Sequence, residues 1–138
     1  MLRRFLLLAS ILIPLFGQSQ CFVCETYSDA LKSPAEVRML QLKDTEERPD
    51  ERIAACENLQ VLFWENAKLF QLPDSFSQLK NLTDLSLANN EFTELPKVLL
   101  NMKNLKVLNL QGNRFDASTK EKIRNEVQRN LPNTKLFL

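Results

Sequence analysis

The apolar residues around the stretch LTDLSLANNEFTELP, residues 82–96, follow neither a plain helical nor a plain strand period. Leu85 and Leu87 alternate with one polar residue between them, which predicts a short strand with one buried face. Further on, Leu99 and Met102 are three residues apart, a spacing typical of a helical or 3₁₀ turn. The pattern therefore predicts a strand followed by a short helical return arm.

This unit repeats along the chain. Leading leucines at 59, 82 and 105 set a period of 23, giving repeats at 59–81 and 82–104 and a partial repeat at 105–115. One such unit cannot bury its own apolar face, whereas stacked copies can. At the turn, a buried Asn90 amide can bond the free backbone groups of adjacent turns. The repeat therefore predicts a coil of stacked units.

The register L-x-x-L-x-L-x-x-N-x-L-x-x-L-P-x-x-L-x-x-L, kept over residues 58–115, resembles the leucine-rich repeat family. Its L-x-x-L-P variant is similar to the 23-residue repeats of Ras-suppressor-type and many bacterial members. The resemblance implies an α/β solenoid, with parallel strands on the concave side and short helical or 3₁₀ arms on the convex side.

A degenerate repeat at 37–58 precedes the full ones. Within it, EVRMLQLKD matches the strand register, and Ile53 and Cys56 take core positions of the return arm. The charged segment KDTEERPDER lacks the asparagine, so we expect a looser loop there. Trp64 replaces a strand leucine in the next repeat, where it must push the neighbouring arm outward or fill a gap. We expect a plug under an N-terminal cap.

Both ends of the coil need caps. We expect an N-terminal cap at 18–36 and a C-terminal capping helix and final strand at 116–138. Ser118 and Glu121 have the spacing of a capping box that would begin this helix, and Pro132 would end it. The last residues, NTKLFL, predict a strand with its leucines turned inward.

The first residues, 1–17, predict a cleaved signal peptide. Arg3 and Arg4 precede an apolar run from Phe5 to Phe16, and Gly17 is a small residue suited to cleavage. As a helix this run spans about 18 Å, short of the roughly 30 Å bilayer core. We therefore expect no transmembrane segment in the mature chain, and a secreted or cell-envelope location, periplasmic or extracellular.

Three cysteines are compatible with one disulfide in an exported protein. Its candidate pairs are Cys21–Cys24, Cys21–Cys56 and Cys24–Cys56, and the core position of Cys56 favours leaving that thiol free. Lipid attachment at Cys21 is an alternative, although Gln20 stands where an acylation site needs a small residue. The C-x-x-C spacing lacks the βαβ unit of a redox motif.

Composition excludes several functions. The chain has 18 basic and 17 acidic side chains, so no net charge favours nucleic acid. It has no histidine and two glycines, which removes histidine-based catalysis, histidine-ligated metals and a glycine-rich phosphate loop. The acidic pairs Glu46-Glu47 and Asp50-Glu51 lie in the charged loop, with no reason for shifted pKa values. We expect no enzyme, catalytic residue, metal or cofactor.

The resemblance implies a protein-binding module that uses the concave sheet. The outward strand positions that we assign to partner binding are Met39, Gln41, Val61, Phe63, Glu65, Asp84, Ser86, Val107 and Asn109. Phe63 could be an interface anchor or could pack sideways against the degenerate repeat or a cap loop. We expect a monomer with a protein partner of unknown identity. The alternative is a structural or lipid-tethered cell-envelope protein.

Asn81 begins an N-x-[ST] sequon, so a glycan could be attached there if the source glycosylates secreted proteins. Leu82 is a core leucine, however, and Thr83 begins a strand, so the site is crowded.

Overall fold

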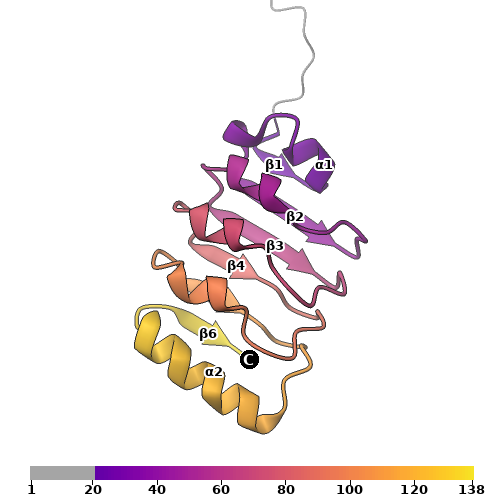
Figure 1. Ribbon diagram of the computed structural model, residues 1–138. Coiled ribbons are helices and arrows are strands. Elements are labelled where there is room, and N and C mark those ends of the chain that lie inside the picture. Colours follow the sequence, from indigo (N-terminus) through magenta and orange to yellow (C-terminus); the bar gives the residue numbers. More distant parts are fainter. Residues whose placement is uncertain (1–20) are drawn as a thin grey trace, which may run out of the picture.

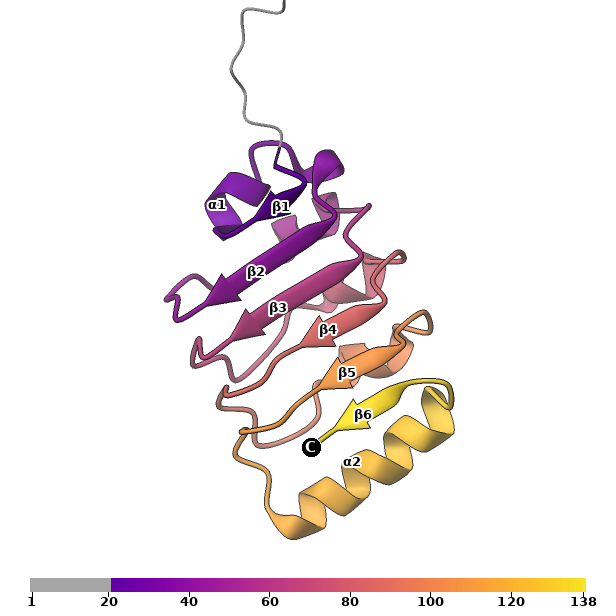
Figure 2. The same cartoon turned by 180° about the vertical axis from the view of Figure 1, so that it is seen from behind.

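Six parallel strands lie side by side in one sheet, in the order of the chain, in the computed structural model, which describes residues 21–138 (Figures 1 and 2). The strands are β1 (Val23–Cys24), β2 (Met39–Lys43), β3 (Val61–Glu65), β4 (Asp84–Ser86), β5 (Val107–Asn109) and β6 (Lys135–Phe137).

Short helical segments cover the other face of the sheet (Figure 1). Those between strands are α1 (Tyr27–Ala30), η1 (Pro34–Glu36), η2 (Glu51–Ala55), η3 (Asp74–Gln78), η4 (Lys97–Asn101) and α2 (Ala117–Asn130). The segments named η are 3₁₀ helices. The predicted α/β solenoid, with strands on one side, short arms on the other and a C-terminal helix, is confirmed.

The inward leucines of neighbouring strands are in register, which explains the sequence period. The step is 22 residues from Leu40 to Leu62, then 23 to Leu85 and 23 to Leu108. These four side chains are at most 1% exposed. The last step, from Leu108 to Leu136, is 28 residues because the 14-residue α2 replaces a five-residue 3₁₀ arm. Each repeat thus buries its apolar face against its neighbours.

Asparagine side chains close the turns after the strands, as predicted for Asn90. Its Oδ1 accepts from the N–H groups of Ala67 and Leu69, at 3.1 and 3.0 Å, and its Nδ2 donates to the carbonyl of Trp64 at 2.7 Å. Asn113 does the same one repeat later, accepting from the N–H of Phe92 at 3.1 Å. A buried amide thereby satisfies backbone groups of a neighbouring turn that would otherwise lack partners.

Trp64 fills the space under the N-terminal elements, as expected. Its ring packs against that of Tyr27 in α1, with centroids 5.1 Å apart, and both side chains are buried. The Tyr27 hydroxyl also donates to Asp50 at 3.0 Å.

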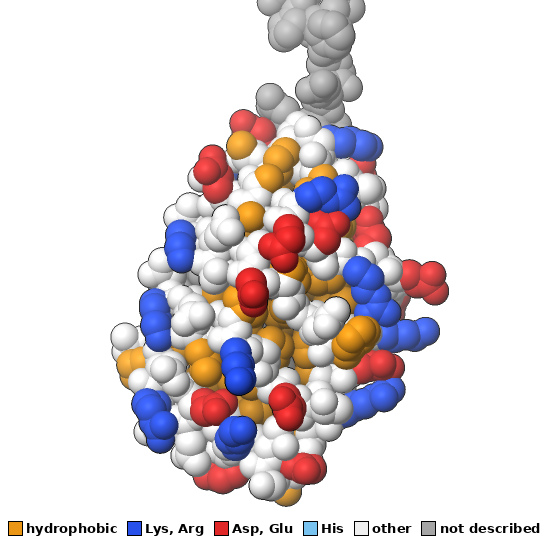
Figure 3. Space-filling view, in the orientation of Figure 1, with side chains coloured by type: hydrophobic (Ala, Val, Ile, Leu, Met, Phe, Trp, Pro, Cys, Tyr) orange, Lys and Arg blue, Asp and Glu red, His pale blue; other side chains and the backbone are white. Residues whose placement is uncertain are grey.

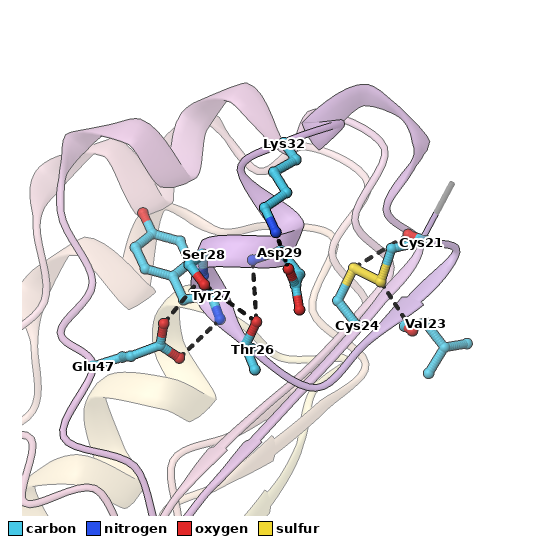
Figure 4. Close-up of a disulfide and its surroundings, with 9 residues drawn as sticks. All are labelled: Cys21, Val23, Cys24, Thr26, Tyr27, Ser28, Asp29, Lys32 and Glu47. Carbon is cyan, nitrogen blue, oxygen red and sulfur yellow. Dashed lines mark hydrogen bonds and ion pairs between the residues drawn. A yellow bond between two sulfur atoms is a disulfide. The ribbon is translucent and has the colours of Figure 1, made fainter. Parts of the chain in front are cut away.

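The charged segment before η2 is not the loose loop that we expected. Glu47 accepts from the N–H groups of Tyr27 and Ser28, at 2.9 and 3.1 Å, so its carboxylate caps the start of α1 (Figure 4). Its contacts are with residues about 20 positions earlier, which a local reading of composition could not reveal.

Of the three disulfide candidates, the structure contains Cys21–Cys24 (Figure 4). Cys56 is free and completely buried. Burial raises the pKa of its thiol to about 11. The predicted signal peptide, 1–17, lies outside the described residues.

The C-terminal helix α2 begins earlier than the predicted capping box. Its N-cap is Asp116, whose carboxylate accepts from the N–H of Thr119 at 2.7 Å, so Ser118 lies inside the helix. An aspartate caps as well as a serine, and only the backbone geometry distinguished the two starting points.

Candidate functional site

The concave sheet face carries two main rows of outward side chains, because strand residues alternate between the faces. One row runs across the strands through Met39, Val61, Asp84, Val107 and Lys135. The other runs through Gln41, Phe63, Ser86, Asn109 and Phe137. Figure 2 shows this side of the sheet, with the strands in front.

The second row, together with Asp84 and Val107 of the first, lines a hollow of about 280 Å³. Phe63 on β3 and Phe137 on β6 lie at its two ends, and the smaller Ser86 and Asn109 lie between them. Two large rings with two short side chains between them leave a depression, and its wall is mainly apolar. Both rings are partly exposed, so they are available for contact.

Charged groups surround the two rings. Lys43 lies 6.0 Å from the Phe63 centroid and forms an ion pair with Glu65 at 3.6 Å. Lys135 lies 4.9 Å from the Phe137 centroid. At these distances each ammonium group is attracted to the face of its ring. The apolar hollow therefore has a polar surround.

The predicted binding residues divide into two groups. Those that line the hollow are Phe63, Asp84, Ser86, Val107 and Asn109. Glu65 lies beside them, and Ser86 donates a hydrogen bond to it.

Met39, Gln41 and Val61 lie toward β2 and outside the hollow, where Gln41 Nε2 donates to the Met39 sulfur at 3.2 Å. Ser86 differs from the prediction because it is only 3% exposed. It forms part of the floor and orients Glu65.

Two residues of this surface, Phe137 and Lys135, were not predicted. The signal was present: a strand in NTKLFL with inward leucines must turn its alternate residues outward. The short strand was interpreted only as the closure of the core, so its outer face was not considered.

A second depression, lined by both polar and apolar side chains, lies between the arms of two repeats. A groove of about 330 Å³ there is lined by Phe70, Leu72, Leu95, Pro96 and Val98, among others. Phe70 is 60% exposed, with the Arg48 guanidinium 5.8 Å from its ring centroid. Figure 3 views the face that carries the arms and shows apolar atoms near its centre, with charges of both signs around them. Phe70 in this groove therefore provides a control for the phenylalanines of the concave hollow.

The titratable side chains Asp50 and Tyr27 take part in structural contacts. Within residues 21–138, no three histidine, cysteine, aspartate or glutamate side chains gather as a metal site. The expectation of unshifted acidic groups is wrong for Asp50, because hydrogen bonds from Arg52 lower the pKa of this carboxyl to about 2. A carboxylate that stays ionised in an ion pair is a poor proton donor or base. Burial and Asp50 raise the pKa of Tyr27 well above its usual value.

The sequon residue Asn81 is exposed, and its Nδ2 donates to the carbonyl of Glu57 at 2.8 Å. Asn58 and Asn104, at the same place in the neighbouring repeats, donate to Ala35 and Lys80 at 2.9 and 2.6 Å. These bonds form a second asparagine ladder, absent from the sequence prediction, which gives Asn81 a structural role. Separately, no helix in the described part of the chain is long and apolar enough to cross a bilayer.

A family model and one solved structure agree with the repeat and the fold. Residues 57–115 match the family model described as leucine rich repeat. A solved leucine-rich-repeat protein of Leptospira interrogans is 31% identical, with a TM-score of 0.68. The match covers 83% of this chain and 28% of that one, so this chain spans less than a third of that protein's length.

Two internalins of Listeria monocytogenes are each 17% identical, with TM-scores of 0.46 and 0.47. The matches cover 83% of this chain in both cases, and 38% and 56% of the internalin chains. The comparison with curated proteins found no match. The repeat register, the parallel sheet and the similarity to the Leptospira protein show that the chain belongs to the leucine-rich repeat family.

Proposed function

We propose that this protein is an exported, non-enzymatic protein-binding module that presents its concave sheet to a macromolecular partner. The observation that carries the proposal is the hollow between Phe63 and Phe137. Leucine-rich repeat proteins generally bind other proteins, and a family does not by itself establish a function, so the site has to support the proposal.

The composition of the hollow supports a protein partner. Interface hot spots are enriched in aromatic side chains that are desolvated within a polar rim. Here two partly exposed phenylalanines lie within reach of Lys43, Glu65 and Lys135. At about 280 Å³, the hollow is slightly smaller than the usual pockets for free small molecules, about 300–1,000 Å³. It is better suited to a side chain of a partner.

Export is supported by two features. The basic start and apolar run of residues 1–17 have the pattern of a signal peptide. The Cys21–Cys24 disulfide suits an oxidising compartment. Cell fractionation and mass spectrometry of the mature N-terminus would test this part. An uncleaved protein in the cytoplasm would contradict it.

The binding surface is tested by quantitative pull-down from the native secreted or envelope fraction. The baits are the purified protein, a Phe63→Ala/Phe137→Ala variant, and Phe70→Ala as the matched control, since Phe70 is an exposed phenylalanine away from the hollow. Circular dichroism verifies that all three are folded. A partner retained by the protein and the control but lost by the double variant supports the concave site.

Two other outcomes point elsewhere. Loss of the partner only with Phe70→Ala would move the site to the groove between the arms. Equal capture by all three baits would contradict a role in binding for the hollow and also for the groove at Phe70.

The alternative is a structural or lipid-tethered cell-envelope protein, favoured by the position of Cys21 shortly after the apolar run that ends at Phe16. A thioether-linked lipid at Cys21 and the Cys21–Cys24 disulfide exclude each other, because both need the same sulfur. Labelled fatty acid incorporated by the protein and lost in Cys21→Ser would favour this alternative. A mass that fits an intact disulfide without a lipid would count against it.

A further inference from the structure

Opposite charges flank the apolar hollow. Asp84, Val107 and Lys135 follow one another across β4, β5 and β6 in the row beside the two phenylalanines. A carboxylate and an ammonium group thus stand on either side of Val107. With neighbouring strands about 4.8 Å apart, their backbone positions are separated by about 10 Å.

Neither charge is neutralised by a nearby ion pair within residues 21–138. Asp84 accepts a hydrogen bond from the Thr83 hydroxyl at 2.6 Å and forms no salt bridge. Lys135 contacts the Phe137 ring and likewise forms none. Glu65 differs, because Lys43 and Ser86 already contact it. The charges free to meet a partner are therefore Asp84 and Lys135.

The β6 side of this row therefore carries one ammonium group, that of Lys135, and the β4 side carries one carboxylate, that of Asp84.

We propose, on the basis of the function inferred above, that the concave site recognises a protein segment with charges of opposite sign on either side of an apolar anchor. One large apolar side chain of the segment enters the hollow between Phe63 and Phe137. A basic residue of the segment meets Asp84, and an acidic residue meets Lys135.

The separation of the charges constrains such a segment. About 10 Å corresponds to three residues of extended chain or seven residues of helix. The two charged residues therefore flank the anchor and are not adjacent to each other. This order provides specificity, because a segment with like charges on both sides would meet one repulsive group.

The energetic roles should differ between the two kinds of contact. Truncating a buried apolar anchor removes most of the contact, whereas exposed charges contribute mainly to selectivity and association rate. We expect affinity to fall 10-fold to 100-fold in Phe63→Ala/Phe137→Ala. We expect a fall of only a few-fold when either charge is neutralised.

The test is selection of a random-peptide display library on the purified, folded protein. Sequencing compares the peptides enriched by the wild type, Asp84→Asn, Lys135→Gln, Phe63→Ala/Phe137→Ala and the control Phe70→Ala. The wild type and the control should enrich peptides with a large apolar residue that has Lys or Arg on one side and Asp or Glu on the other. Asp84→Asn should lose only the basic preference, and Lys135→Gln only the acidic one.

The remaining outcomes separate this inference from the function on which it rests. Peptides that need both phenylalanines but show no charge preference would overturn the inference and leave the concave binding site intact. Peptides enriched equally by the double phenylalanine variant would overturn both. A library that yields no enriched peptide would also overturn the inference, while the pull-down still tests partner binding.

Discussion

Replacing Asn90 with alanine should destabilise the coil more than any comparable change of an exposed asparagine. The Asn90 side chain is 4% exposed, and its Oδ1 is the acceptor found for the N–H groups of Ala67 and Leu69. Asn90→Ala leaves both donors buried without a partner. Alanine offers no hydrogen-bonding atom to replace the amide.

The magnitude follows from these two orphaned groups. A buried donor without a partner costs about 1–3 kcal/mol, so the pair costs about 2–6 kcal/mol in free energy of unfolding. The carbonyls that lose the Asn90 donor contribute less, because that of Leu87 retains a bond from Asn113 at 2.9 Å. With a total stability of about 5–15 kcal/mol for a domain, such a loss would remove a large share of the free energy of unfolding.

The assay is urea unfolding followed by circular dichroism, with Asn104→Ala as the control. Asn104 is exposed and donates one bond, to the Lys80 carbonyl at 2.6 Å, which water can replace. We expect about 4 kcal/mol for Asn90→Ala and at most about 1 kcal/mol for the control. Hydrogen exchange should show that the amides of Ala67 and Leu69 lose protection.

A loss below about 1 kcal/mol for Asn90→Ala, or one equal to that of the control, would refute the reasoning. It would mean that water enters the turn and satisfies the two N–H groups. Unchanged exchange at Ala67 and Leu69 would lead to the same conclusion.

Three further predictions address other parts of the coil. The Cys56 thiol is buried, and its pKa is raised to about 11. It should therefore not react with Ellman's reagent in the folded protein and should react fully in urea. Rapid labelling of the native form would contradict its burial. Arg52 lowers the pKa of the Asp50 carboxyl to about 2. The stability that this carboxylate contributes should therefore be present above about pH 4 and lost as the pH falls through 2. Wild type and Asp50→Asn should therefore differ in thermal midpoint at pH 6 and converge near pH 2; a constant difference would refute the assignment. Gly112→Ala should lower the thermal midpoint by several degrees, because Gly112 has a φ of +72° and the new Cβ would lie 3.3 Å from the Asn89 Cα. An unchanged thermal midpoint would contradict this prediction.

Local sequence was sufficient for the repeating part of the structure. In a stacked coil each unit contacts only its neighbours, so the same apolar positions are buried in every turn. Leu85, Leu87 and Asn90 could therefore be assigned from spacing alone, and the weaker repeat before Leu59 could be aligned to them. The free Cys56 followed from the same alignment.

Features that depend on one particular neighbour could not be read from the period. Glu47 caps α1 through contacts about 20 residues away, and the start of α2 at Asp116 depends on backbone geometry. Neither residue occupies one of the patterned positions of the repeat, so the pattern gave no information about its partner.

The sequence by itself determined the family, the order of strands and arms, and the residues that face the core, because a period of 23 with buried leucines has one way to stack. Only the tertiary structure decided which outward residues form a site. Phe63 and Phe137 belong to strands separated by β4 and β5, and the small Ser86 and Asn109 between them create the hollow. Stacking brings these residues together, because the parallel strands place corresponding positions of successive turns side by side.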